Sequence, residues 1–319
     1  MVSGIEPGTI RVQIQTQSGC NGRCVFCPNA ATLEAKALAH GRIDPALFQK
    51  IVDDLAGLAP RRVSPYLMNE PLLDDRLPEF IRYITDRIPD TTTLVTSNGT
   101  HLTEKMGLAL IDSGLSRIKV SLQSLDPDTN RKLMGASVKS DAVVQNVLAF
   151  KKLLKEKRAK NLDLRVSMIV TKFNQDQIRQ AHRFWRRHGI RLVTSALENR
   201  GGNIDAQALN PHEMEGFYRA CPRPSREMCV LWNGDVVLCC VDWWRTTILG
   251  NLRDQSVLDV WHGPRIEAIR RSLRENDPAA LPKICARCEQ SAQPDHHRSS
   301  LKGFLSRHFK RVVRGNKGV

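Results

Sequence analysis

The chain has 319 residues, 41% of them hydrophobic and 25% charged, which is typical of a globular protein with one large and one smaller domain. It contains no signal-peptide pattern and no run of about 18 apolar residues, which predicts a soluble, cytoplasmic protein. Its formal charge is +15, but aromatics make up only 5% and no nucleic-acid-binding motif is present, so we expect no nucleic-acid partner.

Short apolar runs alternate with helix-period segments over the first two thirds of the chain. Strands are predicted at 10–15, 63–67, 92–96, 117–122, 164–170 and 190–196. Helices are predicted at 44–55, 77–87, 103–113, 141–155 and 176–188. Six strands separated by helices predict an α/β fold, a partial (β/α)6 TIM-like barrel that occupies residues 1–214.

The pattern changes from Cys221 onward. Asn233 and Gly234 between two apolar runs predict a β-hairpin. Helical stretches follow at 257–261 and 264–274, and the sequence CARC follows at 285–288. This predicts a small C-terminal cysteine-rich β-hairpin/helix domain at 215–292.

The last segment, 293–319, is predicted to be a basic amphipathic tail. Apolar side chains recur in it at helical spacing: Leu301, Phe304, Leu305, Phe309 and Val312. We expect this stripe to pack on the barrel, and weak contact with a membrane surface is the alternative.

Polar clusters follow the predicted strands at the point where each strand ends. They are the cysteines at 20–27 and the segments 68–71, 97–99, 121–123, 171–174 and 198–200. Loops after parallel strands emerge on one face of a barrel, where active sites of such folds lie. The sequence therefore predicts an active site built from these six loops.

Three cysteines, Cys20, Cys24 and Cys27, lie within eight residues and have C-x3-C-x2-C spacing. Thiolates are ligands for zinc or for iron–sulfur clusters. A structural zinc site needs four ligands, and no further cysteine or histidine lies close by, whereas a [4Fe-4S] cluster held by three thiolates keeps one iron open. A zinc site completed from elsewhere in the chain is the alternative.

The C-x3-C-x-Φ-C pattern with Phe26 as Φ resembles the radical S-adenosylmethionine (SAM) superfamily, and the other landmarks of that family follow in order over residues 8–200. Segment 68–71 stands where the family has Gly-Gly-Glu-Pro. The resemblance implies that a reduced [4Fe-4S] cluster on the three cysteines cleaves bound SAM to methionine and a 5′-deoxyadenosyl radical. It also implies the residues that contact SAM: Phe26, Asn69, Glu70, Pro71, Ser97, Asn98, Ser121 and Gln123.

The C-terminal cysteines resemble those of SPASM and twitch extensions of radical SAM enzymes. The resemblance implies one auxiliary [4Fe-4S] cluster, in the twitch pattern of butirosin-type aminocyclitol dehydrogenases, ligated by Cys221, Cys239, Cys285 and Cys288. Cys229 and Cys240 are left over, since neighbouring residues of a strand point to opposite faces. A zinc ribbon is the alternative for this domain.

These features predict an oxidoreductase-type enzyme that abstracts hydrogen from a small polar substrate (a sugar, aminocyclitol or nucleotide sugar) for oxidation or epimerisation. Because the radical removes the hydrogen, no side chain is assigned as catalytic. Candidates for substrate contact are Arg165, Lys172, Asn174, Glu198 and Arg200. The expected electron donor is an external flavodoxin or ferredoxin. The first strand begins near residue 10, which leaves no room for a leader-binding domain. A peptide-modifying maturase without its own such domain and a non-enzymatic electron carrier or sensor are the alternatives.

Overall fold

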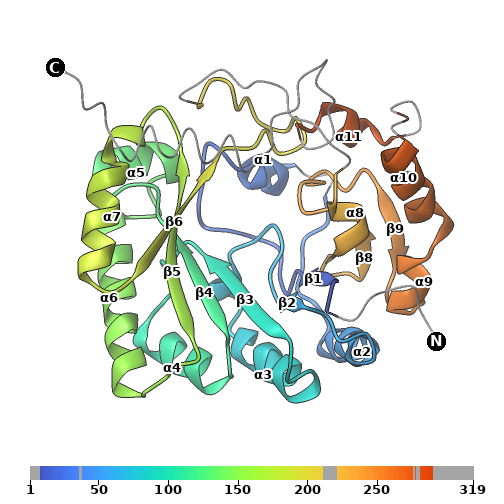
Figure 1. The fold of residues 1–319 in the computed structure, drawn as a ribbon, viewed down its shortest axis with the longest axis horizontal. Coiled ribbons are helices and arrows are strands. Elements are labelled where there is room, and N and C mark those ends of the chain that lie inside the picture. Colours follow the sequence, from blue (N-terminus) through green and yellow to red (C-terminus); the bar gives the residue numbers. More distant parts are fainter. Residues whose placement is uncertain (1–7, 36–37, 211–220, 276, 278–280, 290–319) are drawn as a thin grey trace.

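The computed structural model describes residues 8–35, 38–210, 221–275, 277 and 281–289 (Figure 1). The predicted amphipathic tail lies outside the described residues. The described strands form one sheet of nine, in the order β6-β5-β4-β3-β2-β1-β7-β8-β9. They are β1 (Arg11–Ile14), β2 (Arg62–Ser64), β3 (Thr92–Ser97), β4 (Arg117–Ser121), β5 (Asp163–Val170), β6 (Arg191–Ala196), β7 (Glu227–Val230), β8 (Asp235–Val237) and β9 (Ile248–Asn251).

Strands β1 to β6 are parallel to their neighbours, and helices connect them in sequence order. The helices of this part are α1 (Asn29–Glu34), α2 (Pro45–Ala56), α3 (Leu77–Arg87), α4 (Glu104–Asp112), α5 (Pro127–Met134), α6 (Ser140–Glu156) and α7 (Ile178–Arg187). Short 3-10 turns lie at η1 (Pro71–Leu73) and η2 (Gln175–Gln177). The six predicted strands, the five predicted helices and the α/β partial-barrel class are confirmed.

The crossover helices cover one face of the parallel sheet (Figure 1). Buried side chains of β3 to β6, such as Val95, Ile118 and Val166, form one core with helices α3 to α7. A second core joins β1, β2, β7 and β8 to α2, α3 and α9. Because side chains alternate along a strand, the polar residues between these apolar ones lie on the opposite face, which we call the inner face.

The predicted hairpin is present, but it is also part of the main sheet. Strand β7 pairs antiparallel with β8 and parallel with β1, with Gln13 aligned to Cys229. Strand β9, which the sequence analysis did not predict, pairs with β8. The C-terminal segment thus lies beside the first strand of the chain (Figure 1).

The helices of the C-terminal segment, in its described residues, are α8 (Arg223–Arg226), α9 (Val257–Trp261), α10 (Pro264–Glu275) and α11 (Lys283–Arg287). The two that were predicted, α9 and α10, are confirmed. Helices α1, α5, α8 and α11 were not predicted, because none of them exceeds eight residues and such lengths leave little periodicity to detect. Among the described residues no helix is long and apolar enough to cross a membrane.

Candidate active site

The three N-terminal cysteines lie in the loop after β1. All three are free and half-buried. A Cβ atom added at Gly22 would lie 3.6 Å from the Sγ atoms of both Cys20 and Cys24, so these two sulfurs flank the same glycine. The absence of a side chain at Gly22 leaves space next to both thiols, as a bulky ligand group requires.

Burial and mutual repulsion disfavour the thiolate forms of these cysteines. Burial, together with the charges of Glu70 and Cys27, raises the pKa of Cys20 to about 11. Burial and then the charges of Cys27 and Cys20 raise the pKa of Cys24. Three close thiols of this kind become stable thiolates when a cationic group binds them. The donor set therefore fits an iron–sulfur cluster.

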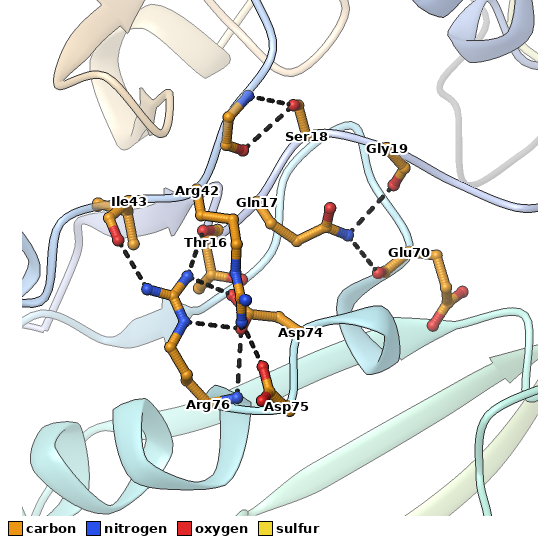
Figure 2. A network of polar contacts seen from close by, with 11 residues as sticks. Thr16, Gln17, Ser18, Gly19, Arg42, Ile43, Glu70, Asp74, Asp75 and Arg76 are labelled. Carbon is orange, nitrogen blue, oxygen red and sulfur yellow. Dashed lines mark hydrogen bonds and ion pairs between the residues drawn. The ribbon is translucent and has the colours of Figure 1, made fainter.

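Hydrogen bonds join the cysteine loop to the loop after β2 (Figure 2). The Gln17 side chain donates to the Glu70 carbonyl at 2.9 Å, and the Glu70 N–H donates to the Gly19 carbonyl at 2.9 Å. Arg76 fixes Thr16, which precedes the cysteines in the chain. It donates to the carbonyls of Thr16 at 3.3 Å and of Ile43 at 2.9 Å. The chain that enters the cysteine loop is therefore fixed by several side chains.

The buried carboxylate of Asp74 holds Arg76 in place for these contacts. It accepts hydrogen bonds from Arg76 Nε and Nη2, both at 2.9 Å, and from Arg42 Nη2 at 2.6 Å (Figure 2). Burial would raise the pKa of Asp74, but the hydrogen bonds from Arg76 and Arg42 outweigh it and lower that pKa. Asp74 and Arg76 support the site without being part of the cysteine motif.

Glu70 connects the second loop to the third. Its carboxylate accepts hydrogen bonds from Ser97 Oγ and from the Asn98 N–H, both at 2.6 Å, and from the Leu72 N–H at 3.1 Å. Burial outweighs these donors and raises the pKa of Glu70 to about 7. The Asn98 side chain in turn donates to Asn21 at 2.7 Å, within the cysteine loop. Three of the predicted SAM-contacting residues, Glu70, Ser97 and Asn98, thus form one connected unit.

Other predicted SAM-contacting residues lie next to this unit. Phe26 is buried in the core, 6% exposed. Asn69 leaves a buried side-chain Nδ2 without a partner among the described residues, and Pro71 begins η1. Met68 has φ = 53°, in the left-handed region that glycine adopts without strain. Its backbone therefore has a conformation typical of the glycine that it replaces in the motif.

Ser121, the last residue of β4, and Gln123, in the loop after it, differ in their surroundings. Ser121 lies on the inner face, 3.4 Å from the Ser167 hydroxyl. Gln123 is buried, and its side-chain oxygen accepts from the Ile169 N–H at 2.7 Å. Asn174, a predicted substrate contact, donates to the carbonyls of Gln123 at 2.8 Å and Ile169 at 2.9 Å. Gln123 and Asn174 therefore join the loops after β4 and β5, and their contacts with ligands stay predictions.

The remaining substrate-contact candidates divide into two groups. Arg165 lies on the inner face of β5 and pairs with Asp163 at 2.6 Å, while Lys172 lies in the loop after β5, its Nζ 5.3 Å from the Phe173 ring centre. Glu198 and Arg200 follow β6, and Glu198 accepts from Arg223 at 2.9 and 3.2 Å. The second group lies at the junction with the C-terminal cysteines.

Four C-terminal cysteines line one small pocket. Its lining is Cys221, Cys239, Cys285 and Cys288 together with Arg223, Pro224, Leu238, Val241 and Ile284. The cysteines are free thiols, and the pocket brings them together from the segment before α8, the segment after β8, and α11 with the residue that follows it. Four thiol donors around a largely apolar space fit an iron–sulfur cluster. Within the described residues, no three His, Cys, Asp or Glu side chains are arranged around a single metal ion.

The two leftover cysteines do not line this pocket. Cys229 is fully buried against Leu67, Leu231 and Val237, and its sulfur accepts a hydrogen bond from Gln13 at 3.7 Å. Cys240 packs between the two neighbouring apolar clusters. Of these two neighbours, Cys239 lines the pocket and Cys240 does not.

The loop after β6 fastens the pocket to the barrel. Asn199 donates to the Arg287 carbonyl at 2.9 Å, and Asn203 donates to the Val241 carbonyl at 3.1 Å. Arg223 lines the pocket and pairs with Glu198 of the same loop. The sequence analysis placed Asn199 in the predicted active-site segment 198–200 but assigned it no contact, and it did not single out Asn21 or Arg223. Asn21 and Arg223 each lie within two positions of a cysteine in the sequence, and that signal would have pointed to them.

A parallel partial barrel with three thiols after its first strand and a four-thiol pocket beside its last loop defines an enzyme class that uses iron–sulfur clusters. The comparison with known families agrees. The chain belongs to the Radical SAM superfamily, whose sequence model matches residues 14–184. A second model, that of an iron–sulfur cluster-binding domain, matches residues 221–289. The protein is therefore a SAM-dependent enzyme with a SAM-binding and an auxiliary [4Fe-4S] cluster, as the sequence predicts.

Two curated relatives show how far the similarity extends. The S-adenosyl-L-methionine-dependent 2-deoxy-scyllo-inosamine dehydrogenase of Niallia circulans is 25% identical over 87% of this chain and 91% of its own length. GTP 3′,8-cyclase of Aquifex aeolicus is 31% identical, but over 57% of this chain and 54% of its own length. The dehydrogenase thus matches both cysteine-containing parts of the chain.

Solved structures share the fold at lower identity. The structure of BtrN in complex with AdoMet and 2-DOIA has a TM-score of 0.61 at 23% identity and covers 90% of this chain and 97% of that one. Streptococcus suis SuiB bound to precursor peptide SuiA has a TM-score of 0.68 at 18% identity and covers 89% of this chain and 70% of that one. Both similarities concern the fold.

Proposed function

We propose that this enzyme oxidises a hydroxyl group of a small polar molecule, such as a sugar, an aminocyclitol or a nucleotide sugar. In this proposal Cys20, Cys24 and Cys27 hold the SAM-binding cluster, within a core of residues 1–214. Cys221, Cys239, Cys285 and Cys288 hold one auxiliary cluster, within residues 215–292. When bound, SAM and its cluster would supply a 5′-deoxyadenosyl radical that takes a hydrogen atom from the substrate. The auxiliary cluster would be the acceptor for the second electron.

The observation that carries the proposal is the four-thiol pocket and its attachment to the barrel. Arg223 lines that pocket and pairs with Glu198, which follows β6. A second redox group held next to the loops of the active-site face suits a net two-electron oxidation. The similarity to a dehydrogenase over 87% of the chain supports oxidation rather than epimerisation.

The chain's own residues prepare the site for these ligands. Glu70 fixes the backbone at Asn98 and the hydroxyl of Ser97, at the edge where SAM would lie. Asn69 offers an unpartnered buried amide nitrogen at the same edge. Glu198, Arg200, Arg165 and Lys172 lie on the late strands or in the loops after them and are the proposed substrate contacts, with Gln123 and Asn174 positioning their loops.

The proposed electron donor is an external flavodoxin or ferredoxin. Two exposed residues of the cysteine loop, Arg23 and Val25, lie beside cluster ligands, and Val25 is 45% exposed. An apolar side chain next to a cation suits the acidic surface of a small electron carrier.

Anaerobic reconstitution followed by reduction with dithionite tests the proposal. We expect about eight irons per chain if both clusters are [4Fe-4S], and formation of 5′-deoxyadenosine from SAM. A Cys24→Ser variant should form none. A set of deuterated sugars, aminocyclitols and nucleotide sugars then identifies the substrate by deuterium transfer into deoxyadenosine. No deoxyadenosine from the fully loaded wild type would refute the proposal, and transfer from a peptide would assign the enzyme to the maturases instead.

A further inference from the structure

The inner face of the sheet carries more cations than carboxylates. The apolar residues of β1, β2, β4, β5 and β7 pack against helices, so the residues between them lie on the inner face. On these five strands the charged ones are Arg11, Arg62, Arg117, Lys119, Arg165, Asp163 and Glu227. Five cations of these strands therefore share two carboxylates.

Three of the five cations form ion pairs with one or other of the two carboxylates. Arg11 pairs with Glu227 at 3.4 Å. Arg117 and Arg165 pair with Asp163 at 2.8 and 2.6 Å. These ion pairs lie near the amino ends of the strands, away from the loops that carry the cysteines.

Of these five cations, Arg62 and Lys119 have no carboxylate within 4.0 Å in the described ranges. The Nε atom of Arg62 is buried and has no hydrogen-bond partner there. Two residues further along β2, the hydroxyl of Ser64 is also buried without a partner. Unpaired buried donors of this kind cost free energy unless a ligand satisfies them.

The charge of Arg62 acts on Lys119 and on the phenol of Tyr66. Burial, followed by the charges of Arg62 and Arg200, lowers the pKa of Lys119. Although burial raises the pKa of Tyr66 overall, the charge of Arg62 works against that rise. The Tyr66 hydroxyl accepts from Thr96 Oγ1 at 2.8 Å, which leaves its own proton available to a ligand. Lys119 is the register partner of Thr96, so the Tyr66 hydroxyl that Thr96 contacts lies beside it, and Arg62 and Ser64 share one face of β2. An anion between these groups would satisfy the unpartnered donors.

We propose that Arg62 and Lys119 bind a phosphoryl group of the substrate, with the hydroxyls of Ser64 and Tyr66 as further donors. Guanidinium and ammonium groups are the usual partners of phosphate oxygens. The inference rests on the proposed function and narrows its substrate class to a sugar phosphate or nucleotide sugar. A cationic aminocyclitol would be repelled by the same two side chains.

The carboxylate of SAM is the other anion that the enzyme binds, and the strand register argues against it as the partner. Lys119 precedes Ser121, a predicted SAM contact, by two residues on β4, which places it about 7 Å deeper along the strand. Arg62 begins β2, and the predicted SAM contacts at 69–71 follow that strand. Both cations therefore lie deeper in the barrel than the predicted SAM contacts, further from the cysteine loop.

Calorimetric titration of the reconstituted, SAM-loaded enzyme with inorganic pyrophosphate tests the inference. We expect binding to the wild type, and a Kd about tenfold higher in Lys119→Met and in Arg62→Met, as for loss of one charged hydrogen bond. Lys119→Arg should bind nearly as the wild type does. Lys152→Met is the matched control, because this exposed lysine lies on α6 and pairs with Glu156. Without pyrophosphate, Lys119→Met should unfold at a higher temperature than the wild type, since it removes a buried charge that lacks a carboxylate partner.

Three results would overturn the inference: no binding of pyrophosphate to the wild type, equal binding to Lys119→Met, or a loss of SAM affinity in that variant. The last result would assign Lys119 to the SAM carboxylate. If Arg62→Met fails to fold, the two Lys119 variants decide the question. Formation of 5′-deoxyadenosine in the same preparations tests the proposed function separately, so an active enzyme that ignores pyrophosphate refutes only the phosphoryl site.

Discussion

The carboxylate of Glu70 accepts a hydrogen bond from the backbone N–H of Asn98 at 2.6 Å, which joins the loop after β2 to the loop after β3. Glu70 is 2% exposed. Its backbone also pairs with Gly19 of the cysteine loop. One residue therefore fixes the relative positions of three loops that we propose bind SAM.

Replacing Glu70 by glutamine should weaken SAM binding. Glutamine keeps one acceptor oxygen for Ser97 and Leu72, but its NH2 group then faces the Asn98 N–H, and two donors oppose each other. We expect a loss of about 1–3 kcal/mol in the free energy of unfolding, the cost of an unsatisfied buried group, and a higher Kd for SAM. Equilibrium unfolding and SAM titration measure the two effects. Glu79→Gln, at an exposed position on α3, is the control. Wild-type SAM affinity in Glu70→Gln would contradict this role.

Asp74→Asn should destabilise the protein by about 2 kcal/mol, less than the 3–5 kcal/mol for a fully buried ion pair, because Arg42 is half-exposed. The pKa of Asp74 is lowered in the folded protein from its usual value of 3.8. The native state therefore favours the carboxylate, so its contribution is complete above pH 3.8 and is lost as the pH falls through the lowered pKa. Urea unfolding at several pH values should show a difference between wild type and variant that is constant near neutrality and shrinks in acid.

Asp75→Asn provides the control for this experiment. Asp75 contacts the same Arg42, but its side chain is 85% exposed. Its replacement should leave the urea midpoint at pH 7 unchanged. Equal destabilisation by both variants would mean that Arg42, rather than the buried Asp74–Arg76 pair, maintains the segment at Thr16.

Local sequence patterns predicted the parts of the molecule that depend on neighbouring residues. The parallel strands follow from short apolar runs, and the cysteine loop follows from the spacing of Cys20, Cys24 and Cys27. Helix α2 begins after Asp44, whose side chain accepts from the Ala46 N–H, as its capping preference predicts.

Contacts between distant residues could not be predicted in this way. Gln13 and Cys229 are 216 positions apart, and their pairing depends on β7 joining the edge of β1. The bond between Asn98 and Asn21 spans 77 positions. No local periodicity records such contacts, because they arise only when the loops of the folded barrel meet. The charge imbalance of the inner face became visible for the same reason only in the fold.

The cysteines that line the pocket should differ from those that do not when each is replaced by serine. Cys239 lines the four-thiol pocket, whereas Cys229 is buried in a separate apolar cluster. After reconstitution, Cys239→Ser should retain about four irons, and Cys229→Ser and Cys240→Ser about eight. Iron and sulfide analysis measures this directly. Loss of four irons in Cys240→Ser, with retention in Cys239→Ser, would exchange the roles of these two neighbours.

Gly201→Ala should disturb the junction between the barrel and the four-thiol pocket. Gly201 has φ = 71°, which is unfavourable for alanine, and an added Cβ would lie 2.9 Å from Cγ1 of Ile284, next to Cys285. Backbone strain and displacement of Ile284 together should cost about 2 kcal/mol in unfolding free energy. Gly57→Ala is the matched control, since Gly57 has φ = −69° and an added Cβ meets no atom within 4 Å. That variant should be neutral or slightly stabilised.

Because the strain lies beside a predicted ligand, Gly201→Ala should also alter the paramagnetic resonance spectrum of the reduced auxiliary cluster while the spectrum of the SAM-binding cluster stays unchanged. An unaltered spectrum with lowered stability would restrict the role of Gly201 to packing.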